Sequence, residues 1–391
     1  SSSEFDHPFI LDYKTELSAD FAARTVFTYN GTIGQIPVRI IFGGEFRRGK
    51  NSAQNFSNLS GVRDTLRFAD GITAVQGFAF QQFEAELRED LLFTASLSQN
   101  GLRYEVDRYS DPLGGSPFEV SRNFSTVWVP RVALSWRVSP EAAFYASLSG
   151  GFSPPTLDEF RTNEGSLNRD LQAEIGLNTE LGFRSRWQSS GVDIDASLFY
   201  FRLRETISSF TNPDGVVLFR NAGATEQPGL ELAVTYPLFG HGTDQRTVLW
   251  ITHRYTGHFF TFKELERNGN DFSGNQLTGV APHLMYNRVE WKFHSGLRFF
   301  FHHRYSDRLP LNDANTDYQE AYHTFAIKGN WSALKREKFQ LNVHAGIDNL
   351  TDEDYSLGND LNAFGGRYYQ PAPGRNWYLG VSLKMTTGTK R

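Results

Sequence analysis

The 391-residue sequence contains no cysteine. This excludes a disulfide framework, a thiolate metal site and a cysteine nucleophile. No window approaches 18 consecutive apolar residues, which excludes a helical membrane span. The formal net charge of −5 is spread along the chain, so no basic stripe predicts a nucleic-acid partner.

Signatures of common enzymes and cofactor sites are also missing. The sequence has no G-x-S-x-G motif, P-loop or H-E-x-x-H. On a strand, His253 and His258 would point to opposite faces, and so would the adjacent His302 and His303. Neither pair alone predicts a metal site. We therefore predict no enzyme activity, no metal site and no cofactor.

Aromatic residues are abundant, with 34 Phe, 16 Tyr and 7 Trp, and they recur in segments of period two. From Phe339 to Ile347, apolar side chains alternate with polar or small ones. About fifteen such segments are present, many longer than a soluble strand of about 5–6 residues. This pattern predicts strands with one apolar and one polar face.

The connections between these segments alternate between short and long. The predicted short turns are 31–35, 87–90, 139–140, 188–191, 294–296 and 332–338. The predicted long loops are 47–71, 107–123, 151–170, 208–221, 263–279 and 351–373. Connections that alternate in this way between short turns and long loops indicate an all-β, transmembrane, antiparallel up-and-down β-barrel. A soluble β-rich binding protein is the alternative.

The side chains of the two faces fit this interpretation. Glu180, Arg184 and His344 lie on the polar face and would face a water-filled lumen. Trp residues near strand ends, such as Trp291 and Trp331, would lie at the membrane interfaces.

Five short motifs resemble those of TonB-dependent outer-membrane receptors, in the order of that family. They are Phe144–Thr156 (FYASLSGGFSPPT), Leu171–Arg184 with its L-x-x-E and E-x-G-x-R pieces, Asn221–Leu232 with N-x-G and G-x-E, Asp348–Tyr355 (DNLTDEDY) and Pro373–Trp377 (PGRNW). Together they cover roughly residues 125–385, and the first hundred residues fit by strand pattern only.

The resemblance implies a barrel of about twenty-two strands around an N-terminal plug, preceded by a TonB-contacting box. Neither plug nor box is recognisable here, so we expect residues 1–391 to be the C-terminal portion of such a barrel domain. The implied location is the bacterial outer membrane. The implied partners are outer-membrane lipid, the TonB complex through a preceding region, and the barrel-assembly machinery, which reads a last strand that here ends at Met385 rather than an aromatic residue.

The resemblance also implies energy-coupled uptake, with ferric siderophores as the first expectation for the cargo. Receptors for cobalamin, haem or carbohydrate share the barrel, and a passive porin-like channel or structural barrel is the alternative from another class. Anionic siderophores would be bound by cationic and aromatic side chains of the external loops. The candidate ligand-binding residues are Arg161, Arg169, Phe364, Arg367, Tyr368 and Tyr369.

Overall fold

The computed structural model describes residues 2–8, 12–110, 117–161, 167–211, 217–221, 223–240, 247–267, 269–336 and 339–385. Eighteen of its strands belong to one sheet. Within the described part of the chain, no helix is long and apolar enough to cross a membrane.

The chain divides into two compact units. The first contains residues 1–134, 147–178 and 203–222, and the second contains residues 135–146, 179–202 and 223–391. Strands β7 (Val127–Ser139), β8 (Ala142–Ser153), β9 (Glu174–Trp187) and β10 (Val192–Arg204) contribute residues to both units. That residues 1–391 make up one domain stays a prediction.

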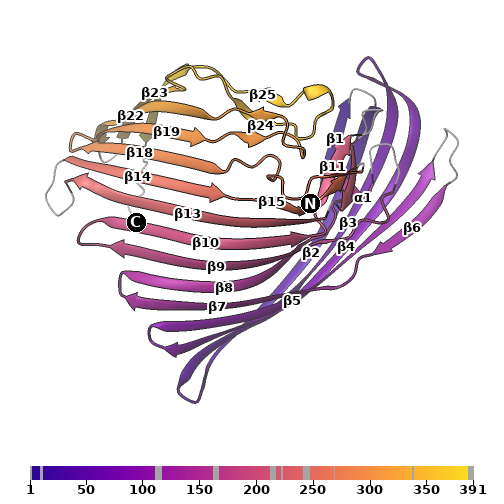
Figure 1. Ribbon diagram of the computed structural model, residues 1–391, viewed down its shortest axis with the longest axis horizontal. Coiled ribbons are helices and arrows are strands. Elements are labelled where there is room, and N and C mark those ends of the chain that lie inside the picture. The colour runs from indigo at the N-terminus through magenta and orange to yellow at the C-terminus, as the bar shows by residue number, and fades with distance from the viewer. Residues whose placement is uncertain are drawn as a thin grey trace. The chain divides into compact units, whose positions relative to one another are not determined.

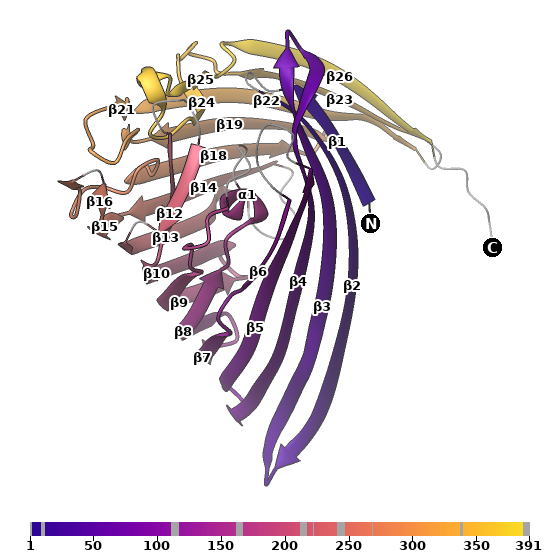
Figure 2. The same ribbon diagram turned by 90° about the vertical axis from the view of Figure 1, so that its right-hand side faces the viewer.

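In the first unit, consecutive strands pair antiparallel, each with the next. They are β1 (Ser2–Pro8), β2 (Asp12–Ile33), β3 (Ile36–Leu59), β4 (Val62–Arg88), β5 (Leu91–Ser110) and β6 (Phe118–Asn123). Figure 2 shows β2, β3 and β4 running side by side over their whole length. Tight turns join them, and at the β2–β3 turn Gly34 has a φ of +62°, which favours glycine. The predicted turns at 31–35 and 87–90 are therefore confirmed.

The predicted long loop at 47–71 is wrong. β3 and β4 continue through it as a paired hairpin that turns only at Ser60 and Gly61. Hydrophobic alternation fades there because the segment is rich in polar residues on both faces, such as Lys50, Asn51 and Ser52. Backbone pairing does not need alternation, so the strands extend further than the pattern that predicted them.

The second unit repeats the same up-and-down pairing (Figure 1). Its paired strands are β13 (Ala224–Phe239), β14 (Thr247–His258), β18 (His283–Phe293), β19 (Leu297–Ser306), β22 (Tyr322–Arg336), β23 (Phe339–Asp348) and β26 (Asn376–Met385), and β15 (Thr261–Glu264) extends the pairing of β13. β22 runs into the predicted turn 332–338, so that turn is shorter than expected.

The register gives each unit an apolar outer face and a polar inner face. In the first unit, Phe27 pairs with Phe42 on the outer face, and their exposed fractions are 55% and 47%. In the second unit, Val343 pairs with Val381, which is 64% exposed. Large apolar side chains with exposed fractions this high are suited to apolar surroundings rather than to water.

On the inner face, aromatic rings lie across glycines of neighbouring strands. A Cβ at Gly182 would lie 2.1 Å from the Tyr145 ring, and one at Gly380 would lie 2.2 Å from Nε2 of His344. The Tyr145 hydroxyl donates to Glu180 at 2.5 Å. Glycine is needed at both places because a side chain would displace the ring.

The first unit also has a small apolar core where the segment after β8 folds onto the inner face. Helix α1 (Leu157–Phe160) begins with a capping box, in which Thr156 and Glu159 each accept from the other's backbone N–H. Phe160 is 1% exposed and packs with Ile72, Tyr104 and Val106. The Tyr104 hydroxyl donates to the Pro155 carbonyl at 2.9 Å, which fixes the entry to the helix.

A buried charge cluster lies next to this core. Asp70 is 0% exposed and accepts from Nε of Arg108 at 2.8 Å and from Nε of Arg161 at 2.5 Å. Arg161 also donates to Asn55 at 3.0 Å. Both guanidinium groups lie near the Phe68 ring, 4.7 and 5.0 Å from its centroid. Arg161 thereby ties the segment after α1 to strands β3, β4 and β5.

Replacing Val381 with Arg should lower the free energy of unfolding by about 2–4 kcal/mol if this residue faces hydrocarbon near the midplane. The adjacent Ser382 lies on the inner face and is also exposed, so Ser382→Arg should cost far less. Reversible unfolding in lipid vesicles measures both. Equal costs for the two variants would contradict the assignment of the faces.

Replacing Asp70 with Asn should destabilise the fold by about 3–5 kcal/mol, because two buried guanidinium groups lose their charged partner. Asp195 is the control, since its ion pair with Arg184 at 3.2 Å is more than half exposed and Asp195→Asn should cost about 1 kcal/mol or less. Limited proteolysis should also cut Asp70→Asn first within the segment 154–171. An unchanged cleavage pattern would show that the cluster does not hold this segment.

Candidate functional site

Three long connections of the second unit meet to form a loop platform, made of residues 259–282, 307–321 and 349–375. They contain only short elements, namely β15 (Thr261–Glu264), β16 (Glu266–Arg267), β17 (Asn270–Asp271), β20 (Leu309–Pro310), β21 (Tyr318–Gln319), β24 (Ser356–Asn359), the 3₁₀ turn η1 (Phe364–Gly366) and β25 (Tyr369–Pro371). All three leave the sheet at the end opposite the short turn 294–296.

Asp313 joins the three connections. Its carboxylate accepts from Arg267 at 2.9 Å, from the Thr278 hydroxyl at 2.7 Å and from the Asn362 side chain at 3.0 Å. Its own backbone N–H donates to Asn362 at 3.0 Å. Asp313 is only 5% exposed, so these charge-assisted hydrogen bonds are shielded from water.

Backbone hydrogen bonds add to this hub. The N–H of Asn362 donates to the Leu311 carbonyl, and that of Gly279 donates to the Pro310 carbonyl. Leu311 is fully buried. At the platform edge, the Ser273 hydroxyl and N–H bind the carboxylate of Asp271 and hold its pKa below the usual value. The loops therefore form a defined surface.

Exposed aromatic and cationic side chains lie on this platform. Tyr369 is 56% exposed, and its ring lies edge-on to that of Tyr368, with 6.4 Å between centroids. The Tyr369 hydroxyl donates to the Tyr318 carbonyl at 3.1 Å. The guanidinium of Arg308 lies 4.9 Å from the Tyr318 ring centroid.

Arg367 is the most available cation of this surface. It is exposed, and among the described residues it has no hydrogen-bond or ion-pair partner. It directly precedes Tyr368 and Tyr369, so one short segment presents a planar cation and two rings. Phe364 lies in η1, but its side chain is outside what the structure describes.

The candidates from the first unit differ from each other. Arg169 is exposed. Arg161 is 3% exposed, and its guanidinium is occupied by Asp70 and Asn55. The structure assigns Arg161 to holding the segment after β8, and its part in ligand capture stays a prediction. Convergence of the first-unit and second-unit candidates on one vestibule also stays a prediction.

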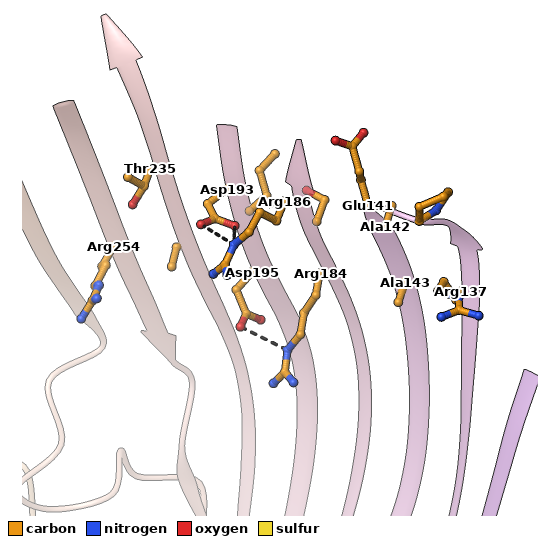
Figure 3. A pocket seen from close by; sticks show the side chains of 14 residues that line it. Arg137, Glu141, Ala142, Ala143, Arg184, Arg186, Asp193, Asp195, Thr235 and Arg254 are labelled. Atoms are coloured by element: carbon orange, nitrogen blue, oxygen red, sulfur yellow. Dashed lines mark hydrogen bonds and ion pairs between the residues drawn. The ribbon is translucent and has the colours of Figure 1, made fainter. Parts of the chain in front are cut away.

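A second polar surface lies on the inner face of the second unit, near the short turn at residues 140–141 (Figure 3). Arg184 and Arg186 point toward Asp195 and Asp193, with Nε–oxygen distances of 3.2 and 3.1 Å. Arg254 lines the same cavity of about 520 Å³. The paired charges are solvated rather than buried, which fits the water-facing role predicted for this face.

No group of three or more metal-ligating side chains (His, Cys, Asp or Glu) occurs in the described ranges. Sequence reasoning also missed residues 307–321 as a long connection, and with it Asp313, Arg308 and Tyr318. The alternation of loop lengths could have found it, because it follows the short turn 294–296.

Comparison with known proteins supports this architecture. The ferric citrate transporter FecA, in its unliganded form, superposes with a TM-score of 0.75 at 14% identity, covering 98% of this chain and 57% of that one. The closed form of the ferric-catecholate import receptor Fiu from K12 E. coli gives 0.71 at 14% identity, with coverage of 96% and 55%. These likenesses confirm the barrel fold.

Sequence comparison gives a curated relative as well. The iron-regulated outer membrane virulence protein of Vibrio cholerae serotype O1 (strain ATCC 39541 / Classical Ogawa 395 / O395) is 24% identical over 287 residues, which is 69% of this chain and 41% of that protein. The chain thus spans less than half the length of this relative.

A family model described as "TonB dependent receptor-like, beta-barrel" matches residues 3–350. That family consists of receptors and transporters rather than enzymes, and it is located in the bacterial outer membrane. The chain belongs to the TonB-dependent receptor family and carries its β-barrel domain.

Proposed function

We propose that this chain is the barrel part of a receptor for energy-coupled, TonB-dependent uptake of ferric siderophores, and that the loop platform makes the first contact with the cargo. The observation that carries this proposal is the segment Arg367, Tyr368 and Tyr369, in which Arg367 and Tyr369 are exposed and Tyr368 is half-buried, on loops tied together by Asp313. The iron-related names of the similar proteins agree with such a cargo.

The chemistry of the segment suits an anionic, partly aromatic ligand. The guanidinium of Arg367 offers a planar fork of donors to carboxylate or catecholate oxygens. The rings of Tyr368 and Tyr369 offer apolar area with a polar tip. A ring pair held edge-on loses little side-chain freedom on binding, so more of the contact energy appears as affinity.

Energy coupling separates this proposal from a passive channel. Uptake of radioactive iron as a ferric siderophore should stop in cells that lack TonB and in cells whose proton gradient is collapsed. Undiminished uptake in both would favour the porin-like alternative. A panel of ferric catecholate, hydroxamate and citrate complexes, with haem, cobalamin and oligosaccharide beside them, would identify the cargo class.

Replacing Arg367 and Tyr368 together with Ala should weaken binding of the cognate siderophore by about tenfold or more, which is about 1.4 kcal/mol. The matched control is Arg39→Ala with Tyr29→Ala, an exposed Arg and Tyr near the short turn 33–36, which should leave affinity unchanged. Titration calorimetry with the intact receptor measures both. An unaltered affinity in the first variant would remove this loop from the site.

Replacing Asp313 with Ala should loosen all three connections of the platform at once, since Asp313 lies in one of them and accepts side-chain hydrogen bonds from the other two. Hydrogen exchange should accelerate in 259–282, 307–321 and 349–375 together, while strands β18 and β19 keep their protection.

The control for this hub is Asp317→Ala. Asp317 accepts mainly within its own connection, from Asn312 at 2.7 Å and from Thr316 at 3.0 Å. Faster exchange should then stay mostly within 307–321. The same pattern in both variants would show that Asp313 has no special role in joining the loops.

A further inference from the structure

A chain of hydrogen bonds links three histidines and an asparagine on four neighbouring strands of the second unit. Nδ1 of His253 lies 2.6 Å from Oδ1 of Asn287, and Nδ2 of Asn287 lies 2.9 Å from Nδ1 of His303. Nε2 of His303 in turn lies 2.9 Å from Nδ1 of His323. We call these four residues the histidine patch. They come from β14, β18, β19 and β22.

The histidine patch lies on the outer face, among the apolar side chains. Two residues away on their strands are Ile251, Val289, Phe301 and Phe325. Phe301 is 39% exposed, and the His303 ring stacks on Phe325 with 4.7 Å between centroids. The sequence pairs His253/His258 and His302/His303 did not reveal the patch, because it forms across strands and not along one.

The patch lies at the end of the strands that leads to the loop platform. β19 has 10 residues from Leu297 to Ser306, and a tilted strand needs about 9–11 residues to cross the hydrocarbon. Counted from Leu297, Tyr305 is the ninth residue and reaches the outer boundary, and His303 lies two residues before it. Polar side chains on the outer face cost least at this level, where lipid headgroups replace acyl chains.

Tyrosines surround the patch, as is usual at a membrane interface. The Tyr305 ring lies 4.7 Å from that of His323, and the Tyr236 ring lies 6.1 Å from that of His253. The Tyr255 hydroxyl bonds to His283 at 2.8 Å. The nearby carboxylate is Asp307, which accepts from the Tyr305 hydroxyl.

Proton counting shows how the patch responds to pH. With neutral rings the amide of Asn287 fixes the direction of the bonds, because its oxygen only accepts and its nitrogen only donates. His253 therefore donates to Asn287, Asn287 donates to His303, and His303 donates to His323. A further proton on His303 would break one of its two bonds. His253 uses only Nδ1 in the chain of hydrogen bonds, so its Nε2 keeps a lone pair and takes a proton with every bond of the chain kept. The patch thus accepts one positive charge without being dismantled.

We propose that the histidine patch is a pH-sensitive binding site for the phosphate group of a lipid headgroup in the outer leaflet. The lipid is favoured over free phosphate because the acyl chains would lie along Phe301 and Ile327, which are exposed directly beside the patch. Protonation gives the patch a positive charge that attracts the phosphate, so binding strengthens as the pH falls. This inference uses the family membership and is independent of the cargo.

The test measures lipid retained by the intact receptor in native mass spectrometry, with phosphatidic acid as the probe and phosphatidylcholine of the same chain length as the control lipid. Retention of phosphatidic acid should be severalfold higher at a pH of about 5.5 than at about 7.5, because the patch gains a positive charge when it takes up a proton. Phosphatidylcholine should show a much smaller change, because its choline cation offsets the negative charge of its phosphate group. A retention that does not depend on pH would overturn the proposal.

Substitutions test whether the pH dependence of lipid retention arises from the histidine patch. His253→Gln with His323→Gln should abolish the pH dependence, and His253→Gln alone should reduce it if the double variant folds poorly. The matched control is His302→Gln, one residue from His303 but on the inner face, where its ring bonds to Tyr286 at 2.7 Å. A loss in the control as large as in the double variant would contradict the assignment.

Competition with inorganic phosphate tests whether the patch binds a lipid or any small anion. Added at the same concentration as phosphatidic acid, it should leave retention of the lipid unchanged, because it lacks the contact with Phe301 and Ile327. Full displacement of the lipid by phosphate would show a site for small anions only, and the lipid proposal would fail.

Discussion

Pairing of backbone N–H and C=O groups between strands is the constraint on which the rest of this structure depends. In hydrocarbon an unpaired backbone group costs several kcal/mol, so every strand needs a neighbour on both sides. The pairing of each strand with the next meets this demand for the strands inside each unit, such as β3 between β2 and β4. Side chains are then free to differ between faces, and Val381 and Ser382 show the result on adjacent positions.

Because the membrane-spanning strands are constrained in this way, we expect the residues that select a ligand to lie in the connections beyond the membrane. These segments are held in two different ways. In the first unit, buried ion pairs between Asp70 and two arginines fix the segment after β8. In the second, Asp313 collects hydrogen bonds from two other connections. Both devices hold loops without a large apolar core, which short external segments could not supply.

The strands and the inner and outer faces could be predicted from sequence because each follows from local period-two alternation, as at Phe339–Ile347. Prediction failed where the structure depends on pairing or contacts between residues that are not close in the sequence. Residues 47–71 lack alternation, yet they pair as a hairpin because backbone bonding needs no apolar side chain. The burial of Arg161 depends on Asp70, 91 residues earlier, and no spacing rule brings them together. The histidine patch likewise depends on cross-strand register. By contrast, the loop position of Arg367, Tyr368 and Tyr369 could be predicted because it is a local property, and their part in ligand binding stays a prediction.

Accessibility of spin labels tests the central claim, that alternation turns one face to lipid and the other to water. Cysteine is absent from the chain, so single cysteines at Leu181 and Glu180 can each carry a label. In lipid vesicles, the label at Leu181 should collide more with apolar oxygen, and the label at Glu180 more with a water-soluble nickel complex. The reverse order at these two adjacent residues would contradict the assigned register and the account built on it.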